Sequence, residues 1–218
     1  MSIALSIGNN LTTNGVFTSS AVNNTSVTNV TDFASVVGGG NLKLLSTQTA
    51  SASATIDFTS GIDGTYDTYV FKFINCHPAT NDVNFQFNLS TDGGSSYNVT
   101  KTTTRFTALH SESDSPHASL QYESTRDLAQ STADKILLNG VGNGDDESCS
   151  GELILYNPSS TTFTKHFMAR AVENRSDDTA EDAYGAGYAN TTSAINAVRF
   201  LFGSGNIDEG IIKMYGVV

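Results

Sequence analysis

The stretch VNFQFNL, from Val83 to Leu89, alternates apolar and polar side chains without a break. Its apolar residues fall at every second position, so in an extended chain they share one side. The amides of Asn84, Gln86 and Asn88 share the other side. A strand with one buried face and one wet face is typical of an antiparallel sheet.

Short segments of the same kind recur along the chain, separated by Gly, Pro, Asn and Asp. The next clearest is TYVFKFIN (68–75), with an aromatic ring at every second position and Pro78 just beyond it. The other predicted strands are 52–58, 99–108, 134–139, 150–157, 164–172, 195–202 and 210–217. About nine strands at this spacing predict an all-β fold, a two-sheet antiparallel β-sandwich of jelly-roll type. The best candidate for a helix is Ser124–Ala133.

Two turns predict which strands are neighbours. Asp92-Gly93-Gly94 follows the first strand and supplies residues that tolerate a positive φ, as a tight hairpin loop requires. The turn between Asn206 and Gly210 predicts a closing hairpin of Ala197–Phe202 with Gly210–Val217. In that last strand Ile212 and Met214 alternate with Ile211, Lys213 and Tyr215, so the chain is expected to finish inside the sandwich.

The composition also favours strands. Charged residues make up only 15% of the chain, which holds 12 Phe and 8 Tyr but no Trp. Its polarity comes from Ser, Thr, Asn and Gly, which compete with or weaken a helical backbone. Thr, Val, Ile and the aromatic residues suit a pleated, half-buried surface instead.

The first 40 residues differ from the rest, with many Ser, Thr and Asn and a single charged residue, Asp32. The chain is therefore divided into residues 1–40, an extended N-terminal arm for anchoring and assembly, and residues 41–218, the β-sandwich domain. A solvated tail is the alternative for the arm. The thinly spaced apolar side chains of residues 1–40 favour an arm that contacts a partner. They are Leu11, Val16, Phe17, Val22, Val27, Val30 and Phe33.

The formal net charge of −11 makes nucleic acid an unfavourable partner, because an acidic surface repels phosphates. No apolar run is long enough to span a bilayer, and the N-terminus lacks the basic and apolar regions of a signal peptide. Cys76 and Cys149 fit no metal or redox spacing and are interpreted as buried apolar side chains.

Few residues of the sequence form a pattern that suits catalysis. His110 and His117 flank a polar loop with Ser, Glu and Asp, but nothing signals an oxyanion hole, and no catalytic residue or cofactor is predicted. Asp145, Asp146 and Glu147 on a Gly-rich loop are candidate calcium ligands, with a solvated acidic turn as the alternative. Residues 173–182 are interpreted as a second acidic loop. Tyr184 and Tyr188 beyond it suit sugar stacking, the core or a subunit contact.

Several segments resemble virion structural proteins of tailed bacteriophages, especially marine ones. They are IGNNLTTNGVFTSSAVNNTSVTNVT (7–31), TASASATIDFTSGIDGTYDTYVFKFINCHPATN (49–81), FQFNLSTDGGSSYN (85–98), LYNPSSTTFTKHF (155–167) and GYANTTSAINAVRFLFGSGNIDEGIIKMYGVV (187–218). The resemblance covers most of the chain and lies in its overall character and in short stretches of sequence rather than in catalytic residues. It implies a non-enzymatic assembly role in the virion, with no functional residues to carry over.

The expected function is that of a capsid decoration (cement) protein. Its arm would bind the major capsid protein or another virion protein, and its body would form a homo-oligomer, with a trimer favoured. The alternative is a tail-fibre or receptor-binding β-domain that contacts the host surface, although the absence of Trp disfavours sugar stacking. A third class, a carbohydrate-active enzyme, would need two carboxylates facing each other across a groove.

Overall fold

The computed structural model describes residues 41–115 and 117–218. These residues fold into two antiparallel sheets, which confirms the expected all-β sandwich. They contain no helix that is long and apolar enough to cross a bilayer. The predicted arm and its contact residues, from Leu11 to Phe33, lie outside the described residues.

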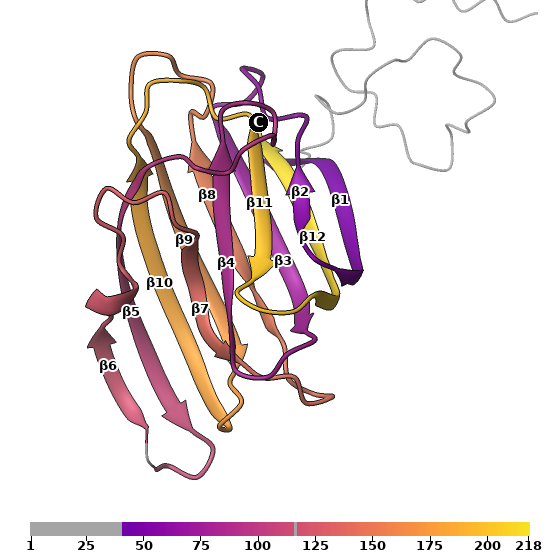
Figure 1. Cartoon of the computed structure of the whole chain (residues 1–218), viewed down its shortest axis with the longest axis vertical. Coiled ribbons are helices and arrows are strands. Elements are labelled where there is room, and N and C mark those ends of the chain that lie inside the picture. The colour runs from indigo at the N-terminus through magenta and orange to yellow at the C-terminus, as the bar shows by residue number, and fades with distance from the viewer. Residues whose placement is uncertain (1–40, 116) are drawn as a thin grey trace, which may run out of the picture. The chain divides into compact units, whose positions relative to one another are not determined.

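The larger sheet has eight strands (Figure 1). In spatial order they are β1 (Leu42–Ser53), β12 (Ile207–Val217), β3 (Thr68–Pro78), β8 (Cys149–Tyr156), β9 (Lys165–Asn174), β10 (Thr179–Ala189), β5 (Lys101–Ser111) and β6 (Ala118–Tyr122). The smaller sheet lies in front of it in Figure 1. Its strands, again in spatial order, are β2 (Ile56–Phe58), β11 (Ala197–Phe202), β4 (Val83–Ser90) and β7 (Lys135–Val141).

Aromatic side chains from both sheets fill the space between them. Phe200 of β11 is fully buried, and its ring centroid lies 5.7 Å from that of Phe71 and 6.0 Å from that of Phe85. Phe73 packs against Phe85 with ring centroids 5.1 Å apart. The alternation in β3 and β4 therefore points the aromatic residues inward, as the sequence predicts.

Both predicted hairpins are wrong. Gly93 and Gly94 do adopt positive φ, but the strand before them, β4, pairs with β11 and β7, while the strand after them, β5, belongs to the other sheet. Likewise β11 lies in the small sheet, and β12 pairs with β1 and β3 in the large one. Each turn carries the chain from one sheet to the other.

Three other assignments change. The predicted strand 52–58 is interrupted between Ser53 and Ile56, and its two parts pair in different sheets. The candidate helix is only a single 3-10 turn, Ser124–Arg126. Most of the predicted acidic loop 173–182 belongs to the ends of β9 and β10. The jelly-roll connectivity stays a prediction.

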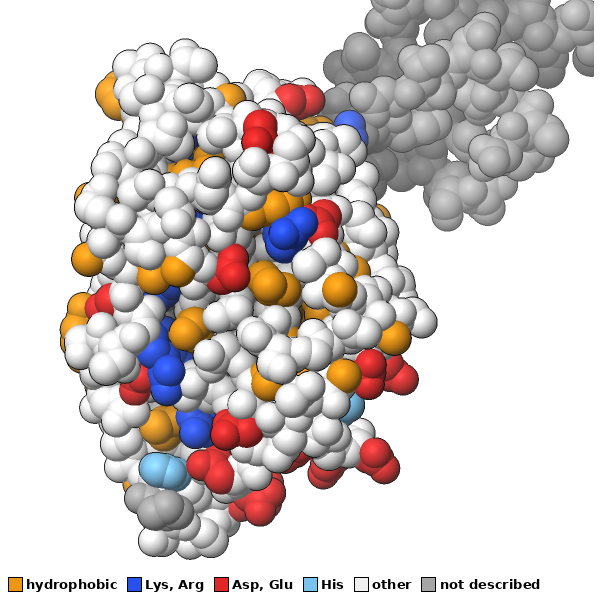
Figure 2. Space-filling model, in the orientation of Figure 1, with side chains coloured by type: hydrophobic (Ala, Val, Ile, Leu, Met, Phe, Trp, Pro, Cys, Tyr) orange, Lys and Arg blue, Asp and Glu red, His pale blue; other side chains and the backbone are white. Residues whose placement is uncertain are grey.

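The outer face of the four-stranded sheet is polar. Arg199 of β11 donates to Asp57 of β2 at 2.8 Å, and its guanidinium lies 3.9 Å from the ring centroid of Tyr97. Figure 2 shows the molecule from this side, where white polar side chains and backbone predominate. The opposite side of the molecule has a different character.

Candidate functional site

The open face is our name for the side of the eight-stranded sheet that points away from the four-stranded sheet. Strand alternation decides which residues it carries. In β3, for example, Tyr69, Phe71 and Phe73 enter the core, so Lys72 and Ile74 project from the open face. Among the described residues no second layer covers it, because the four-stranded sheet packs on the other side.

This face gathers large apolar side chains that contact water. Leu120 is 74% exposed and Met168 is 53% exposed. Most of the large apolar residues exposed in the described part of the chain lie here: Leu42, Leu44, Ile74, Phe106, Leu120, Tyr122, Met168 and Val172. Large exposed apolar patches mark interaction sites in soluble proteins. The open face is therefore the candidate functional site.

The strand register arranges the open face in rows that cross the sheet. One row, here called the central row, runs through all eight strands. In order from β1 to β6 it consists of Thr47, Lys213, Lys72, Glu152, Arg170, Tyr184, Phe106 and Tyr122. Its first half carries charges and its second half carries aromatic rings.

The charges of the central row are partly paired within the sheet. Lys72 lies 3.4 Å from Glu152. Arg170 donates to Asp182 at 2.8 Å, and its guanidinium sits 4.8 Å from the ring centroid of Tyr184. Tyr184 in turn stacks on Phe106, with centroids 4.8 Å apart and planes only 3° from parallel. The side chains of Lys72, Glu152 and Arg170 are each 40% exposed or more, so they stay available to a partner.

Two apolar rows flank the central row. The first, here called the aliphatic row, consists of Leu44, Tyr215, Val70, Ile154, Met168, Ala186 and Thr104. On the other side Thr49, Ile211 and Ile74 align on the first strands, and Ser150, Val172, Asp182, Ala108 and Leu120 align on the later ones. The open face thus mixes apolar, aromatic and charged side chains, and its charged residues are Lys72, Lys213, Arg170, Glu152 and Asp182 in these three rows.

Shallow hollows occur on the open face where small residues interrupt these rows. One hollow of about 480 Å³ is lined by Tyr156, His166, Tyr188, Thr102 and Thr104, around the small residues Ala186 and Gly187. Another lies between Lys72, Glu152, Arg170 and Val172.

Comparisons of the chain with protein-family models, curated proteins and solved structures find no match. The open face is therefore interpreted from its own chemistry.

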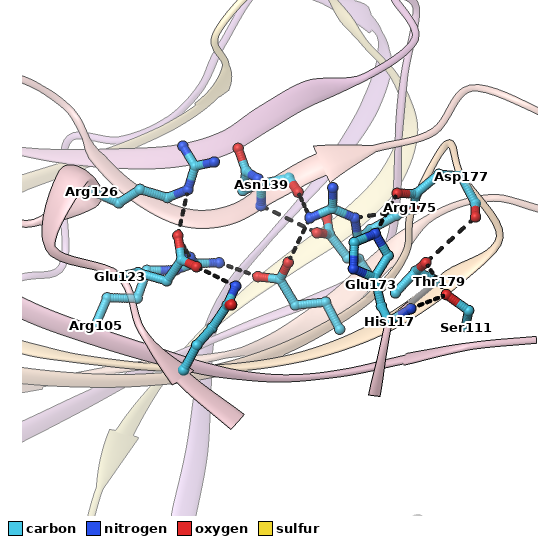
Figure 3. Close-up of polar contacts among 12 residues, drawn as sticks. Arg105, Ser111, His117, Glu123, Arg126, Asn139, Glu173, Arg175, Asp177 and Thr179 are labelled. Carbon is cyan, nitrogen blue, oxygen red and sulfur yellow. Dashed lines mark hydrogen bonds and ion pairs between the residues drawn. The ribbon is translucent and has the colours of Figure 1, made fainter. Parts of the chain in front are cut away.

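A buried polar network lies on the inner side of the same sheet (Figure 3). Arg105, only 1% exposed, is ion-paired with Glu181 and lies 3.5 Å from Glu123. Arg126 also donates to Glu123, at 3.0 Å. Arg175 donates to Glu181 at 3.1 Å. A buried charge is expensive unless it is paired, so this network depends on all its members.

The network connects the two sheets at the β5 side. Arg175 donates to the backbone carbonyl of Asn139 in β7 at 2.9 Å. Lys135, at the start of β7, donates to the carbonyl of Arg126 at 2.9 Å. Burial lowers the pKa of Lys135 to about 8, because a charged ammonium loses its hydration there. These bonds close the sandwich where the aromatic core ends.

Glu173 completes the network with a carboxyl group that favours its neutral form. It lies directly opposite Glu181 in the β9–β10 register, and its Oε1 accepts from the Asn139 backbone N–H at 3.2 Å. Burial, and next the negative charge of Glu181, raise the pKa of Glu173 well above its usual value. Both carboxyl groups are buried and paired with groups of the fold, so they are placed to hold the fold rather than to meet a substrate.

The residues singled out from the sequence are dispersed. Asp145 and Asp146 are exposed, while Glu147 folds back to accept from the Gly144 N–H of its own loop. Within 41–115 and 117–218 no group of three His, Cys, Asp or Glu side chains is arranged to hold a metal ion. The hydroxyl of Ser111 accepts from the backbone N–H of His117, whose imidazole lies 3.7 Å from Asp177.

Cys76 and Cys149 lie opposite each other on β3 and β8 as buried free thiols. Burial raises the pKa of Cys76 to about 12 and also raises that of Cys149, so both stay protonated and unreactive at neutral pH. Their interpretation as buried apolar side chains agrees with this placement.

Sequence reasoning missed the open face because its rows come from strand pairing. No strand is predicted around Tyr184 and Tyr188, for which sugar stacking, the core and a subunit contact all stay open, whereas both project from the open face in β10. The one available signal was alternation in Lys165–Val172, where His166, Met168 and Arg170 share a side with Val172. A large apolar residue on the expected wet side of a strand indicates a contact surface.

Proposed function

We propose that the protein is a non-enzymatic structural component of a tailed-bacteriophage virion, in the role of a capsid decoration protein. The observation that carries the proposal is the open face, an uncovered side of the sheet that exposes large apolar and aromatic side chains among charged ones. Such surfaces form contacts between proteins, and their area is shared among many residues. Enzyme sites are concave and converge on a few polar groups.

Residues 1–40 supply the anchor in this proposal. Their scattered apolar side chains, such as Val16, Phe17 and Phe33, suit an extended segment that lies along a capsid subunit. The acidic and hydroxyl-rich remainder of the surface keeps the body soluble outside the shell. The resemblance of the chain to virion structural proteins supports the same role.

The test is to locate and count the protein in purified particles. A decoration protein is expected in hundreds of copies on the head, seen by quantitative mass spectrometry and by electron microscopy of labelled particles. A handful of copies at the tail would refute it. Deleting residues 1–40 should abolish incorporation while the far-ultraviolet circular dichroism of the sandwich persists, and retained incorporation would refute the anchor.

A tail-fibre or receptor-binding domain is the second candidate, and the hollow at Tyr188 favours it. Tyr156, His166 and Tyr188 combine ring faces with the hydroxyls of Thr102 and Thr104, a combination that suits a saccharide. Binding of host-surface glycans by the purified chain, lost in Tyr188→Ala and kept in Phe163→Ala, would support this role. Phe163 is an exposed ring in the loop between β8 and β9, outside the strands that form the open face, and is the matched control.

A further inference from the structure

We propose that the open face is the interface of a two-fold dimer, in which it packs against the open face of a second copy of this chain. The inference concerns the purified protein and does not depend on a place in the virion. It follows from the order of charges and rings in the central row and from the position of that row in the sheet.

The middle of the sheet lies between β8 and β9, with β3, β12 and β1 on one side and β10, β5 and β6 on the other. A two-fold axis that runs along the strands at this midpoint turns the second copy face to face with the first. Each row then meets the same row of the second copy in reverse strand order. β8 faces β9 of the second copy, β3 faces β10, and β12 faces β5.

The central row complements itself under this rotation. Glu152 of β8 faces Arg170 of the second copy, and symmetry repeats the pair, so two ion pairs flank the axis. Lys72 faces Tyr184 of the second copy, and Lys213 faces its Phe106. An ammonium group over an aromatic ring is favourable, and more so when water is excluded.

The flanking rows complement themselves in size. Met168 meets Ile154 of the second copy at the axis of the aliphatic row. Farther out, Val70 meets Ala186 and Tyr215 meets Thr104, so a larger side chain faces a smaller one. In the third row Ile211 meets Ala108 in the same way, while Ile74 meets Asp182, whose carboxylate is paired with Arg170 of its own chain. Large and small residues in facing positions let two layers interdigitate.

The size of the face also fits a dimer. Eight strands about 4.8 Å apart, and three rows about 6.7 Å apart along the strands, cover an area of roughly 35 by 20 Å. That corresponds to about 700 Å² per copy, close to the roughly 800 Å² per partner of a standard interface. Sheets pack face to face at about 10 Å, a gap that Glu152 and Arg170 side chains span together.

Charge favours a second copy over an unrelated partner. The chain has a net charge of −11, and two copies repel through most of their surface. The three rows together carry Lys72, Lys213 and Arg170 against two carboxylates, Glu152 and Asp182, so the open face has a small positive charge. The open face is therefore the region where two acidic molecules approach each other at the lowest electrostatic cost.

Sedimentation equilibrium of the full chain over a wide concentration range gives the first test. The expected species is a pair of 23.0 kDa chains in reversible equilibrium with the monomer. A monomer at every concentration overturns the proposal, and so does a trimer, since a two-fold axis closes after two copies.

A charge swap between two variants gives the sharper test. Glu152→Lys puts like charges opposite each other twice in its homodimer, and Arg170→Glu does the same with carboxylates. Each variant alone should dimerise at least tenfold more weakly than the unmodified chain. In an equimolar mixture the heterodimer has opposite charges at both positions, one pair with reversed polarity and the other formed by the native Glu152 and Arg170, so the paired mass should return. Absence of that recovery overturns the two-fold register.

Matched controls separate this interface from a general charge effect. Asp57→Lys and Arg199→Glu reverse the cross-strand ion pair on the outer face of the four-stranded sheet. These variants should dimerise as the unmodified chain does. Met168→Lys should weaken the dimer, whereas Phe163→Lys, an equally drastic change outside the open face, should not. The opposite pattern would place the interface elsewhere and overturn the proposal.

Discussion

Glu173 and Glu181 lie directly opposite each other on β9 and β10, and both side chains are buried. Arg105 and Arg175 are both paired with Glu181, while Oε2 of Glu173 has no hydrogen-bond partner in the described part of the chain. The two carboxyl groups therefore lie in unequal electrostatic environments. Glu181 accepts the ion pairs, whereas burial and the charge of Glu181 raise the pKa of Glu173 and favour its neutral form.

This inequality predicts a pH-dependent stability difference. The pKa of Glu173 is raised in the fold, whereas the unfolded chain releases the same proton near about pH 4.3. Above that pH the unfolded chain binds fewer protons, so this group lowers the free energy of unfolding as the pH rises, until it ionises in the fold. Glu173→Gln should remove the effect. Its stability relative to the unmodified chain should rise by about 1.4 kcal/mol per pH unit in urea unfolding.

Glu112→Gln is the control for that measurement, because Glu112 is exposed on the loop after β5. Its stability difference should stay nearly constant across the same pH range. A constant difference for Glu173→Gln would show that its carboxyl group ionises normally in the fold.

Loss of Arg105 should be severe. Arg105→Met leaves Glu181 with Arg175 alone and Glu123 with Arg126 alone, both of which are less buried cations, and breaking a buried pair on one side costs about 3–5 kcal/mol. The free energy of unfolding from urea titration measures this. Lys43→Met, at an exposed position of β1, should change the stability by less than about 0.5 kcal/mol. Similar effects of the two substitutions would contradict the network.

Phe200 is expected to be the most costly single core residue. Its ring packs against Phe58, Phe71, Phe73, Phe85 and Phe87. Phe200→Ala should lower the free energy of unfolding by about 3–5 kcal/mol through lost burial and the cavity left behind. Phe163→Ala, which removes a 69% exposed ring, should be nearly neutral in the same thermal or urea unfolding.

The two thiols should not react with alkylating reagents in the folded protein. Cys76 and Cys149 are buried and their pKa values are raised, so neither supplies thiolate to an alkylating reagent at neutral pH. Iodoacetamide labelling, followed by intact mass, should modify neither residue in buffer and both in concentrated urea. Rapid labelling in buffer would show that β3 and β8 separate locally.

Chelation should not affect stability. Glu147 is engaged by the N–H of Gly144, and Asp145 and Asp146 point into solvent, so the loop is held by its own backbone. The melting temperature with EDTA should equal that with added calcium. A large fall on chelation would restore the calcium-site alternative for these three acids.

The fold class and most strands could be predicted because alternation is a local property. Val83–Leu89 shows it in seven consecutive residues, and the structure places β4 there. Strand partners could not be predicted from the turns. Gly93 and Gly94 indicate that the chain turns, but the packing of the core determines which sheet the next strand joins. That strand, β5, pairs with β10, some 70 residues later in the sequence.

β10 was missed for a similar reason. Its sequence TAEDAYGAGYA holds two acids and two glycines, which are typical of a loop. Glu181 is tolerated in this strand because Arg105 of β5 lies beside it, and Gly187 because the backbone of Thr102 approaches too closely for a Cβ atom. Both reasons come from residues distant in the sequence, so no local pattern could reveal them.

The two ends of the sandwich domain meet. Leu42 pairs with Val217, and the backbone N–H of Val218 donates to the carbonyl of Asn41 at 2.9 Å. A polypeptide fused at Asn41 and another fused at Val218 would leave the domain from one point. The domain is thus suited to circular permutation, or to insertion into a surface loop of a carrier protein, without a long linker. A force applied between Asn41 and Val218 would separate β1 from β12 one residue pair at a time, in unzipping geometry.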